Sequence, residues 1–163
     1  MKKFSQIEYT RPNFETFKSD FLTILENIKA ATTYDSQKEL IYEINSLNNE
    51  FDTAVNIIYI RHSIDTRDKF YEAEKEWLDR TLPELSLFSE KYYRVIVKSE
   101  FRADLEKEFG EQLFTIADFQ IKQIDERIVE DRKEENKLCS QYSKLLASAK
   151  IDWNGEELNL SQL

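Results

Sequence analysis

The chain contains one histidine, His62, and one cysteine, Cys139, so its capacity for metal and nucleophilic chemistry is narrow. A His-Glu-x-x-His zinc helix needs two imidazoles one turn apart, and a di-iron bundle needs a Glu-x-x-His motif on each of two helices. One histidine excludes both sites within this sequence. Cys139 and His62 would form a nucleophile and its base only if the fold brought them within hydrogen-bonding reach. The simpler interpretation is a small buried thiol and a hydrogen-bonded histidine.

Other catalytic patterns are missing or unspecific. Gly110 and Gly155 are isolated, whereas a phosphate-binding loop needs clustered glycines, and the Gly-x-Ser-x-Gly motif of serine hydrolases does not occur. Glu72 and Glu76 lie one helical turn apart, a spacing that an acid–base couple allows. In a chain with 32 acidic residues, such pairs are expected by chance on solvated helix faces. We therefore predict no catalytic, cofactor-binding or metal-binding residue in this chain.

Aromatic residues make up 13% of the chain and allow two interpretations. Most of them fall on apolar helical stripes, which is typical of a helix-packing core. Trp77, Tyr92 and Tyr93 could instead line a groove for a peptide, but we favour the core. The charged segment Glu130–Lys137 is likewise better explained as a solvated helix face than as a docking site.

The balance of charges limits the partners of the protein. With 23 Lys and Arg against 32 Asp and Glu, the net charge is −9. Such a surface repels nucleic-acid phosphates and anionic membranes. No apolar run has the length of a signal peptide core or a membrane span, and a single cysteine fits a reducing compartment. We predict a cytoplasmic protein that binds neither nucleic acid nor membrane.

The scarcity of turn-forming residues, two glycines and two prolines, favours long helices with few corners. After an extended arm that ends at Pro12, apolar residues recur every three or four positions, which predicts a helix that ends near Ala31. Ser36 followed by Glu39 is a capping-box pattern, and a helix from there to about Ser63 would be roughly 40 Å long. The apolar stripes of these two helices are Phe14, Phe17, Phe21, Leu25 and Ile28, and Leu40, Ile44, Leu47, Phe51, Val55 and Ile58.

A third helix is expected after a cap at Asp65 or Thr66. Pro83 cannot donate a backbone hydrogen bond and crowds the preceding turn, so we expect a kink or break near residue 82. Thr81 could cap a fresh start there. The stripe of this helix is Phe70, Ala73, Trp77, Leu85, Phe88, Tyr92 and Val95.

Three further helical stretches follow. Ser99 could cap a short helix that ends at Gly110, and another helix would continue to Ile128. The segment Glu130–Lys137 has no apolar residue and should stand in water before a last apolar face is buried. The last two stripes are Leu113, Ile116, Ile121, Ile124 and Ile128, and Leu138, Tyr142, Leu145 and Ala149.

The end of the chain differs from the rest. Asn154-Gly155 favours a type I′ turn and predicts a β-hairpin, which is marginal alone and needs a helix face or further protein to pack on. The predicted fold is predominantly all-α, with long antiparallel helices in a bundle-like lobe over residues 1–150. The short hairpin would occupy residues 151–163.

Several segments carry a resemblance to a known family through their order and spacing. They resemble the N-terminal region of M3-family oligoendopeptidases of the oligoendopeptidase F type, over the length of this chain but only about the first third of such an enzyme. The segments are Tyr9–Pro12, Asn49–Thr53, Ile60–Thr66, Glu134–Leu138, Ser143–Ile151, Asn154-Gly155 and Leu158–Leu163.

The resemblance implies a mostly helical, cytoplasmic enzyme with a zinc ion in a deep channel, held by His-Glu-x-x-His and a later glutamate. The zinc ion would polarise the scissile carbonyl and activate a water, with the motif glutamate as general base. All of these residues would lie beyond Leu163. The expected role of this chain is therefore part of the channel wall, packed against a C-terminal catalytic domain and inactive alone, in an enzyme that cuts short peptides. The alternative is a free-standing helical module that binds a partner protein.

Overall fold

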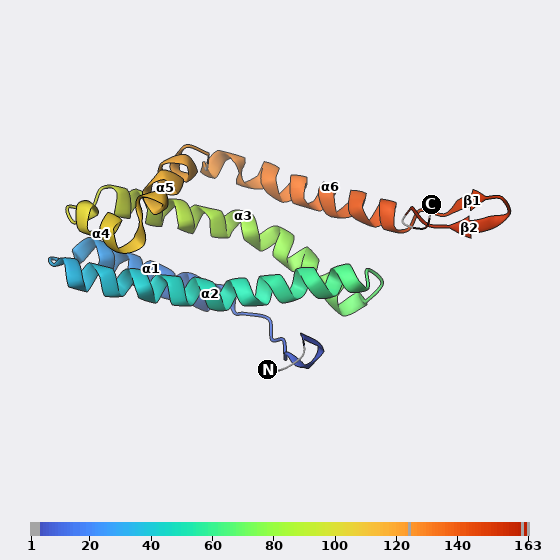
Figure 1. The fold of residues 1–163 in the computed structure, drawn as a ribbon, viewed down its shortest axis with the longest axis horizontal. Helices are drawn as coiled ribbons and strands as arrows, with labels where there is room; N and C mark the ends of the chain where they lie inside the picture. The colour runs from blue at the N-terminus through green and yellow to red at the C-terminus, as the bar shows by residue number, and fades with distance from the viewer. Residues whose placement is uncertain (1–3, 124, 161, 163) are drawn as a thin grey trace.

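Three long helices form the body of the protein, for which a computed structural model describes residues 4–123, 125–160 and 162. α1 (Phe14–Ala30) and α2 (Tyr34–Ile64) form an antiparallel pair, and α3 (Lys69–Val97) runs back along both of them (Figure 1). The predominantly all-α class is confirmed. Of the residues named in the sequence analysis, Ile124, Ser161 and Leu163 lie outside the described part of the chain.

The second half of the chain turns round at one end of this body. α4 (Arg102–Phe109) and α5 (Glu111–Gln123) make the turn, and α6 (Val129–Ala147) then returns along α3 (Figure 1). A short 3₁₀ turn, Glu126–Ile128, precedes α6, and another, Phe4–Gln6, lies in the N-terminal arm. No helix in the described part of the chain combines the length and the hydropathy that a membrane span requires.

The core lies between α1, α2 and α3 and is rich in aromatic rings. The ring of Phe17 lies 4.8 Å from that of Phe51, and the ring of Phe21 lies 5.9 Å from that of Phe88, measured between centroids. These residues come from three of the predicted stripes, so the stripes identified the core faces of α1, α2 and α3. α4 and α5 add Leu105 and Phe114 to this core, whose other fully buried side chains are Leu25, Ile28, Ile41, Ile44 and Ile96.

Short polar side chains explain where α1 and α2 begin. Asn13 and Thr33 each accept a hydrogen bond from the backbone N–H three residues later, at 3.1 and 3.3 Å. This bond satisfies one of the donors that a helix start leaves free. The predicted cap of α2, Ser36, was wrong, because Ser36 is the residue whose N–H Thr33 caps.

α3 also begins a few residues away from its predicted cap. Asp68 accepts hydrogen bonds from two backbone N–H groups in the first turn of the helix. Asp65, one of the two predicted caps, instead accepts from the Arg67 N–H at 3.0 Å in the connecting turn. The prediction of Asp65 or Thr66 was therefore wrong, although an aspartate does cap the helix.

The prediction was a kink or a break near residue 82, and α3 continues through Pro83, so a break with a new start at Thr81 is wrong. A proline has no N–H to donate to the carbonyl four residues earlier, which belongs to Asp79. Asn136 from α6 donates to that oxygen at 3.2 Å instead. The Thr81 hydroxyl donates to a carbonyl one turn earlier, as in a helix interior. A partner on a neighbouring helix therefore satisfies the group that the proline leaves free.

The predicted helix through Ile128 is divided in two. α5 ends at Gln123, and Ile124 is not among the described residues. The Asp125 carboxylate accepts from the Arg127 N–H at 2.9 Å, and the Ile128 N–H donates to the Asp125 carbonyl at 3.1 Å. This local turn offers the backbone an alternative to the α-helical bonds, and α6 starts after it.

α6 does not bury the face that its apolar residues predicted. Leu138, Tyr142 and Leu145 are 55%, 61% and 66% exposed, so this prediction was wrong. The reason is that α6 packs on α3 through its polar side chains, such as Asn136. Most of Glu130–Lys137 is exposed, as expected for a solvated segment.

The C-terminal hairpin has the predicted turn. β1 (Ile151–Trp153) pairs antiparallel with β2 (Glu156–Leu158). Asn154 and Gly155 both have positive φ, 54° and 84°, as a type I′ turn requires. The hairpin extends beyond α6 (Figure 1), and the Trp153 side chain is exposed.

Candidate functional site at the junction of α2, α3 and α6

A cleft of about 520 Å³ opens where the end of α2 and the first half of α3 meet α6. It brings together His62 from α2 and Cys139 from α6. The sequence left open whether the fold places these two residues near each other, and the structure does so. The other residues that line the cleft are Tyr59, Ser63, Thr66, Lys75, Asp79, Asn136, Ser140, Ser143 and Lys144.

The two residues are not arranged as a nucleophile and its base. Nε2 of His62 is buried and has no hydrogen-bond partner in the described part of the chain, so it does not activate the Cys139 thiol. Burial lowers the pKa of His62, and the charges of Lys75 and Lys144 lower it further, so the imidazole is neutral at pH 7. The thiol is exposed, so its predicted burial was wrong.

A polar cluster joins α3 to α6 along one wall of the cleft. The buried Asp79 carboxylate forms an ion pair with Lys75 and accepts a hydrogen bond from the Ser140 hydroxyl at 2.5 Å. Nζ of Lys75 also donates to the Ser140 hydroxyl oxygen at 2.9 Å. Asn136 adds the bond to the Asp79 carbonyl described above. These contacts satisfy both charges, so the cluster holds two helices together and leaves no group free for acid–base chemistry.

Sequence reasoning missed this cluster, although one signal for part of it was present. A proline inside a helical stripe leaves the carbonyl four residues earlier without a donor. Pro83 therefore pointed to Asp79 as a residue that needs a partner from outside its own helix. Nothing in the sequence identified Asn136 as that partner.

Glu72 and Glu76 are not an acid–base couple. Lys144 and Lys69 both bind the Glu72 carboxylate, and these two hydrogen-bonded charges lower the pKa of Glu72 to about 2. Glu72 therefore stays ionised and cannot act as an acid near neutral pH. Glu76 lies on the exposed side of the helix, 4.0 Å from Nζ of Lys144.

The N-terminal arm is fastened to α3 by a second polar cluster. The buried Glu74 carboxylate accepts a hydrogen bond from the Tyr9 hydroxyl at 2.5 Å and from Nε and Nη2 of Arg11 at 2.9 and 2.7 Å. These bonds, with the Arg11 bonds as the largest cause, lower the pKa of Glu74, while burial opposes them. Arg11 also lies over the Trp77 ring, at 5.3 Å from its centroid. The segment Tyr9–Pro12 is thus a structural strap.

The aromatic residues considered for a peptide groove belong to the core. Tyr92 is buried among the core residues, and burial raises the pKa of its hydroxyl. Trp77 and Tyr93 are partly buried against the same core. The core interpretation is confirmed for these three residues.

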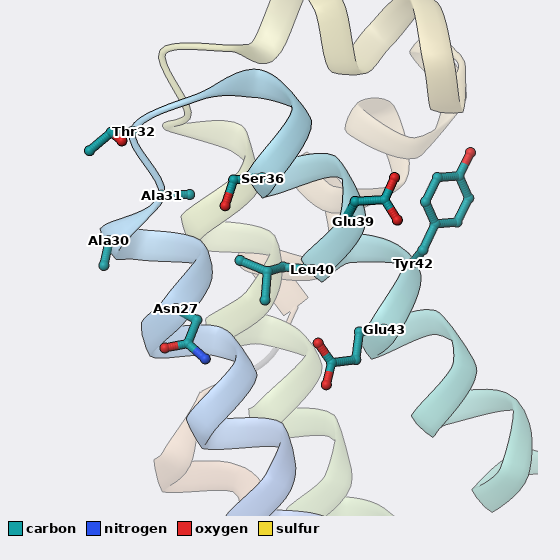
Figure 2. A pocket seen from close by; sticks show the side chains of 9 residues that line it. All are labelled: Asn27, Ala30, Ala31, Thr32, Ser36, Glu39, Leu40, Tyr42 and Glu43. Atoms are coloured by element: carbon teal, nitrogen blue, oxygen red, sulfur yellow. The ribbon is translucent and has the colours of Figure 1, made fainter.

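A second hollow lies at the corner between α1 and α2 (Figure 2). Leu40 and Glu43 of α2 point toward α1 across it, with Asn27 on the α1 side. Tyr42 donates a hydrogen bond to Glu108 at 2.6 Å. The residues that line this hollow include no histidine, cysteine or lysine beside the carboxylates, so the hollow holds no nucleophile–base pair.

The described residues do not fit a zinc site. They contain no group of three His, Cys, Asp or Glu side chains that could hold a metal ion. The only imidazole of the chain, His62, also lacks the second imidazole that a His-Glu-x-x-His site needs.

The comparison with protein families identifies the chain. Residues 4–124 match the Peptidase M3 N-terminal domain, which covers α1 to α5 and more than half of the chain. The chain belongs to the M3 peptidase family. The resemblance drawn from the ordered sequence segments is therefore confirmed.

Solved structures of M3 peptidases have the same fold in this region. PZ peptidase A, in a structure with an inhibitor, is 45% identical and has a TM-score of 0.95, over 98% of this chain and 28% of its own. A protein assigned as oligoendopeptidase F from Bacillus anthracis str. Ames is 45% identical, with a TM-score of 0.92 over 97% of this chain and 29% of its own. Another protein assigned as oligoendopeptidase F is 42% identical, with a TM-score of 0.95 over 99% of this chain and 29% of its own.

The chain thus spans less than a third of the length of these M3 peptidases. The matched part includes nearly all of this chain, so α6 and the hairpin have counterparts in the longer structures. The comparison with curated proteins gave no match.

Proposed function

We propose that this chain is the N-terminal scaffold domain of a cytoplasmic, zinc-dependent oligopeptidase that hydrolyses short peptides. The domain forms part of the wall of the reaction channel and packs against a C-terminal catalytic domain of the same enzyme. It supplies no catalytic residue.

The family match carries this proposal. An M3 N-terminal domain over residues 4–124, in a chain that spans less than a third of its solved relatives, fits one part of a larger peptidase. The catalytic part would then lie in the remaining length of the enzyme.

The residues of this chain support a structural role for it and a catalytic role for the remaining part of the enzyme. A bound zinc ion would polarise the scissile carbonyl and activate a water, but a chain with one histidine cannot provide a two-histidine zinc site. The carboxylates considered for acid–base chemistry are bound to lysine side chains, Glu72 to Lys144 and Asp79 to Lys75. This chain therefore contributes part of the channel wall and no catalytic group.

A channel wall must be rigid in order to exclude bulky substrates. The aromatic core fixes α1, α2 and α3 against one another, and the Glu74 cluster fixes the arm to α3. A wall of this kind would admit extended peptides and exclude folded proteins, because a folded domain has a diameter of about 30 Å.

The test compares the full-length enzyme with the 163-residue chain. We expect the full-length enzyme to bind one zinc ion per chain and to cleave a quenched fluorescent peptide but not a folded protein that contains the same sequence. We expect the 163-residue chain to do neither. Metal-dependent cleavage by this chain alone, or a coding sequence without His-Glu-x-x-His after Leu163, would contradict the proposal.

A further inference from the structure

The faces of α6 are reversed relative to the usual pattern of a helix that packs on a protein core. Its side toward α3 consists of polar residues, among them Asn136, Ser140 and Lys144. Leu138, Tyr142 and Leu145 follow one another at steps of four and three residues, about 140° to 200° around the helix from Ser140. The apolar stripe therefore faces away from the protein body.

Other apolar residues of the C-terminal part of the chain are exposed as well. Leu146, one turn after Tyr142, is 40% exposed, and Trp153 of β1 and Leu160 after β2 are also exposed. Contiguous exposed apolar surface on a protein marks an interaction site. A two-stranded hairpin is at best marginally stable in water without a further surface to pack on. Both features indicate that polypeptide from elsewhere covers this surface.

We infer that the outer face of α6, formed by Leu138, Tyr142 and Leu145, is the surface on which the part of the M3 peptidase that follows this chain docks. The inference rests on the proposed function and adds to it the residues that carry the contact between the two parts.

The comparisons favour this occupant. This chain superposes over 98% of its length, with a TM-score of 0.95, on a peptidase of which it covers only 28%. The extended α6 and hairpin therefore exist in a chain that has more than twice as much further polypeptide to place against them. A second copy of this chain would carry the same net charge of −9, which opposes association.

The inner face of α6 explains why docking does not require α6 to leave α3. Asp79, Ser140 and Asn136 satisfy one another across the α3–α6 contact, and Lys133 of α6 pairs with Glu84 of α3 at 2.8 Å. These polar bonds fix the rotation of α6 about its axis. Because that rotation is fixed, the apolar stripe always faces away from α3.

A photo-crosslinker at position 142 of the full-length enzyme tests the inference. We would replace Tyr142 with p-benzoylphenylalanine, which keeps an aromatic ring, and identify the cross-linked peptides by mass spectrometry. We expect cross-links to peptides that follow residue 163 in the same polypeptide. Ser143, which is exposed and about 160° around the helix from Leu145, provides the control position. We expect it to give no such cross-link.

A substitution adds a second, independent measurement. Leu145→Asp would place a charge in the docked surface, so we expect the full-length enzyme to lose several degrees of thermal stability and to bind more hydrophobic dye. Ser143→Asp adds the same charge outside the stripe, and we expect little change from it.

The outcomes separate this inference from the proposed function. An active zinc peptidase whose position 142 cross-links only to a second copy, to another protein or to nothing would overturn the inference alone. Cross-links to the following polypeptide in a protein without peptidase activity would support the inference and count against the proposed function.

Discussion

The α1–α3 body and the α6 arm are both helical, yet they are held in opposite ways. The body buries apolar stripes, with Phe21 at 1% exposure, and its buried carboxylates on α3, such as Glu74 and Asp79, each have a basic partner. α6 turns the partly buried Asn136 and Ser140 toward α3, where both bond to Asp79, and leaves Leu145 in solvent. An apolar stripe therefore shows which residues share a face of a helix, whereas the direction of that face depends on the partners that the rest of the molecule provides.

The largest expected loss of stability comes from removing an aromatic ring from the core of the α1–α3 body. Phe21→Ala would remove a ring that contacts Phe17 and Phe88 and leave a cavity between α1 and α3. We expect a loss of about 3–5 kcal/mol in the free energy of unfolding, measured with urea. Phe119→Ala is the matched control, because this ring is 59% exposed on α5, and a change within about 0.5 kcal/mol is expected. Equal losses for the two variants would refute the assignment of the core.

The next largest effect concerns the polar contact between α3 and α6. Asp79→Ala would leave Lys75 without its ion-pair partner and Ser140 without its acceptor. We expect a loss of about 2–3 kcal/mol and faster amide hydrogen exchange in α6 than in α1. Asp131→Ala, on the exposed side of α6, should change neither quantity. Unchanged exchange in α6 of the Asp79 variant would show that other contacts hold the helix.

The contact between the N-terminal strap and Glu74 of α3 should make the stability of the body depend on pH. Hydrogen bonds from Arg11 lower the pKa of Glu74 below its ordinary value of 4.5. Because the folded-state pKa is the lower one, this contribution to stability is complete above about pH 4.5 and is lost as the pH falls through the folded-state pKa. We expect the urea unfolding free energy to fall in that range, and to fall less steeply in Glu74→Gln. Parallel pH profiles of the two proteins would show that ionisation of Glu74 does not contribute to the stability of the fold.

Much of the body could be predicted from sequence because its periodic stripes are local, whereas the capping residues of α2 and α3 were misplaced by three residues or fewer. The course of α3 could not, since the group that satisfies the Asp79 carbonyl beside Pro83 comes from Asn136. The cleft could not either, because no local pattern relates His62 to Cys139. The exposed face of α6 was predicted to be buried, because its apolar stripe has the same period as the stripes of the body and does not show which partner is present.

Pro83 provides a finer test of whether Asn136 of α6 replaces the hydrogen bond that the proline removes from α3. Asn136→Ala removes one hydrogen bond to a carbonyl that has no helical donor, so we expect a loss of about 1 kcal/mol in unfolding free energy. Pro83→Ala supplies an N–H to the same carbonyl. In the Pro83→Ala background, Asn136→Ala should therefore cost clearly less, which a double-mutant cycle measures. Additive effects would mean that the two groups do not share the Asp79 oxygen.

The smallest expected effect is also the one that distinguishes the two regions most directly. In the 163-residue chain, Leu145→Ala removes a side chain that is 66% exposed, so the unfolding free energy should change by less than about 0.5 kcal/mol. In the full-length enzyme the same substitution should cost about 2 kcal/mol or more, because the docked surface would then bury Leu145. Phe21→Ala should cost a similar amount in both proteins, since its surroundings lie within this chain. A Leu145 variant that is neutral in both would mean that the apolar stripe of α6 faces solvent in the complete enzyme as well.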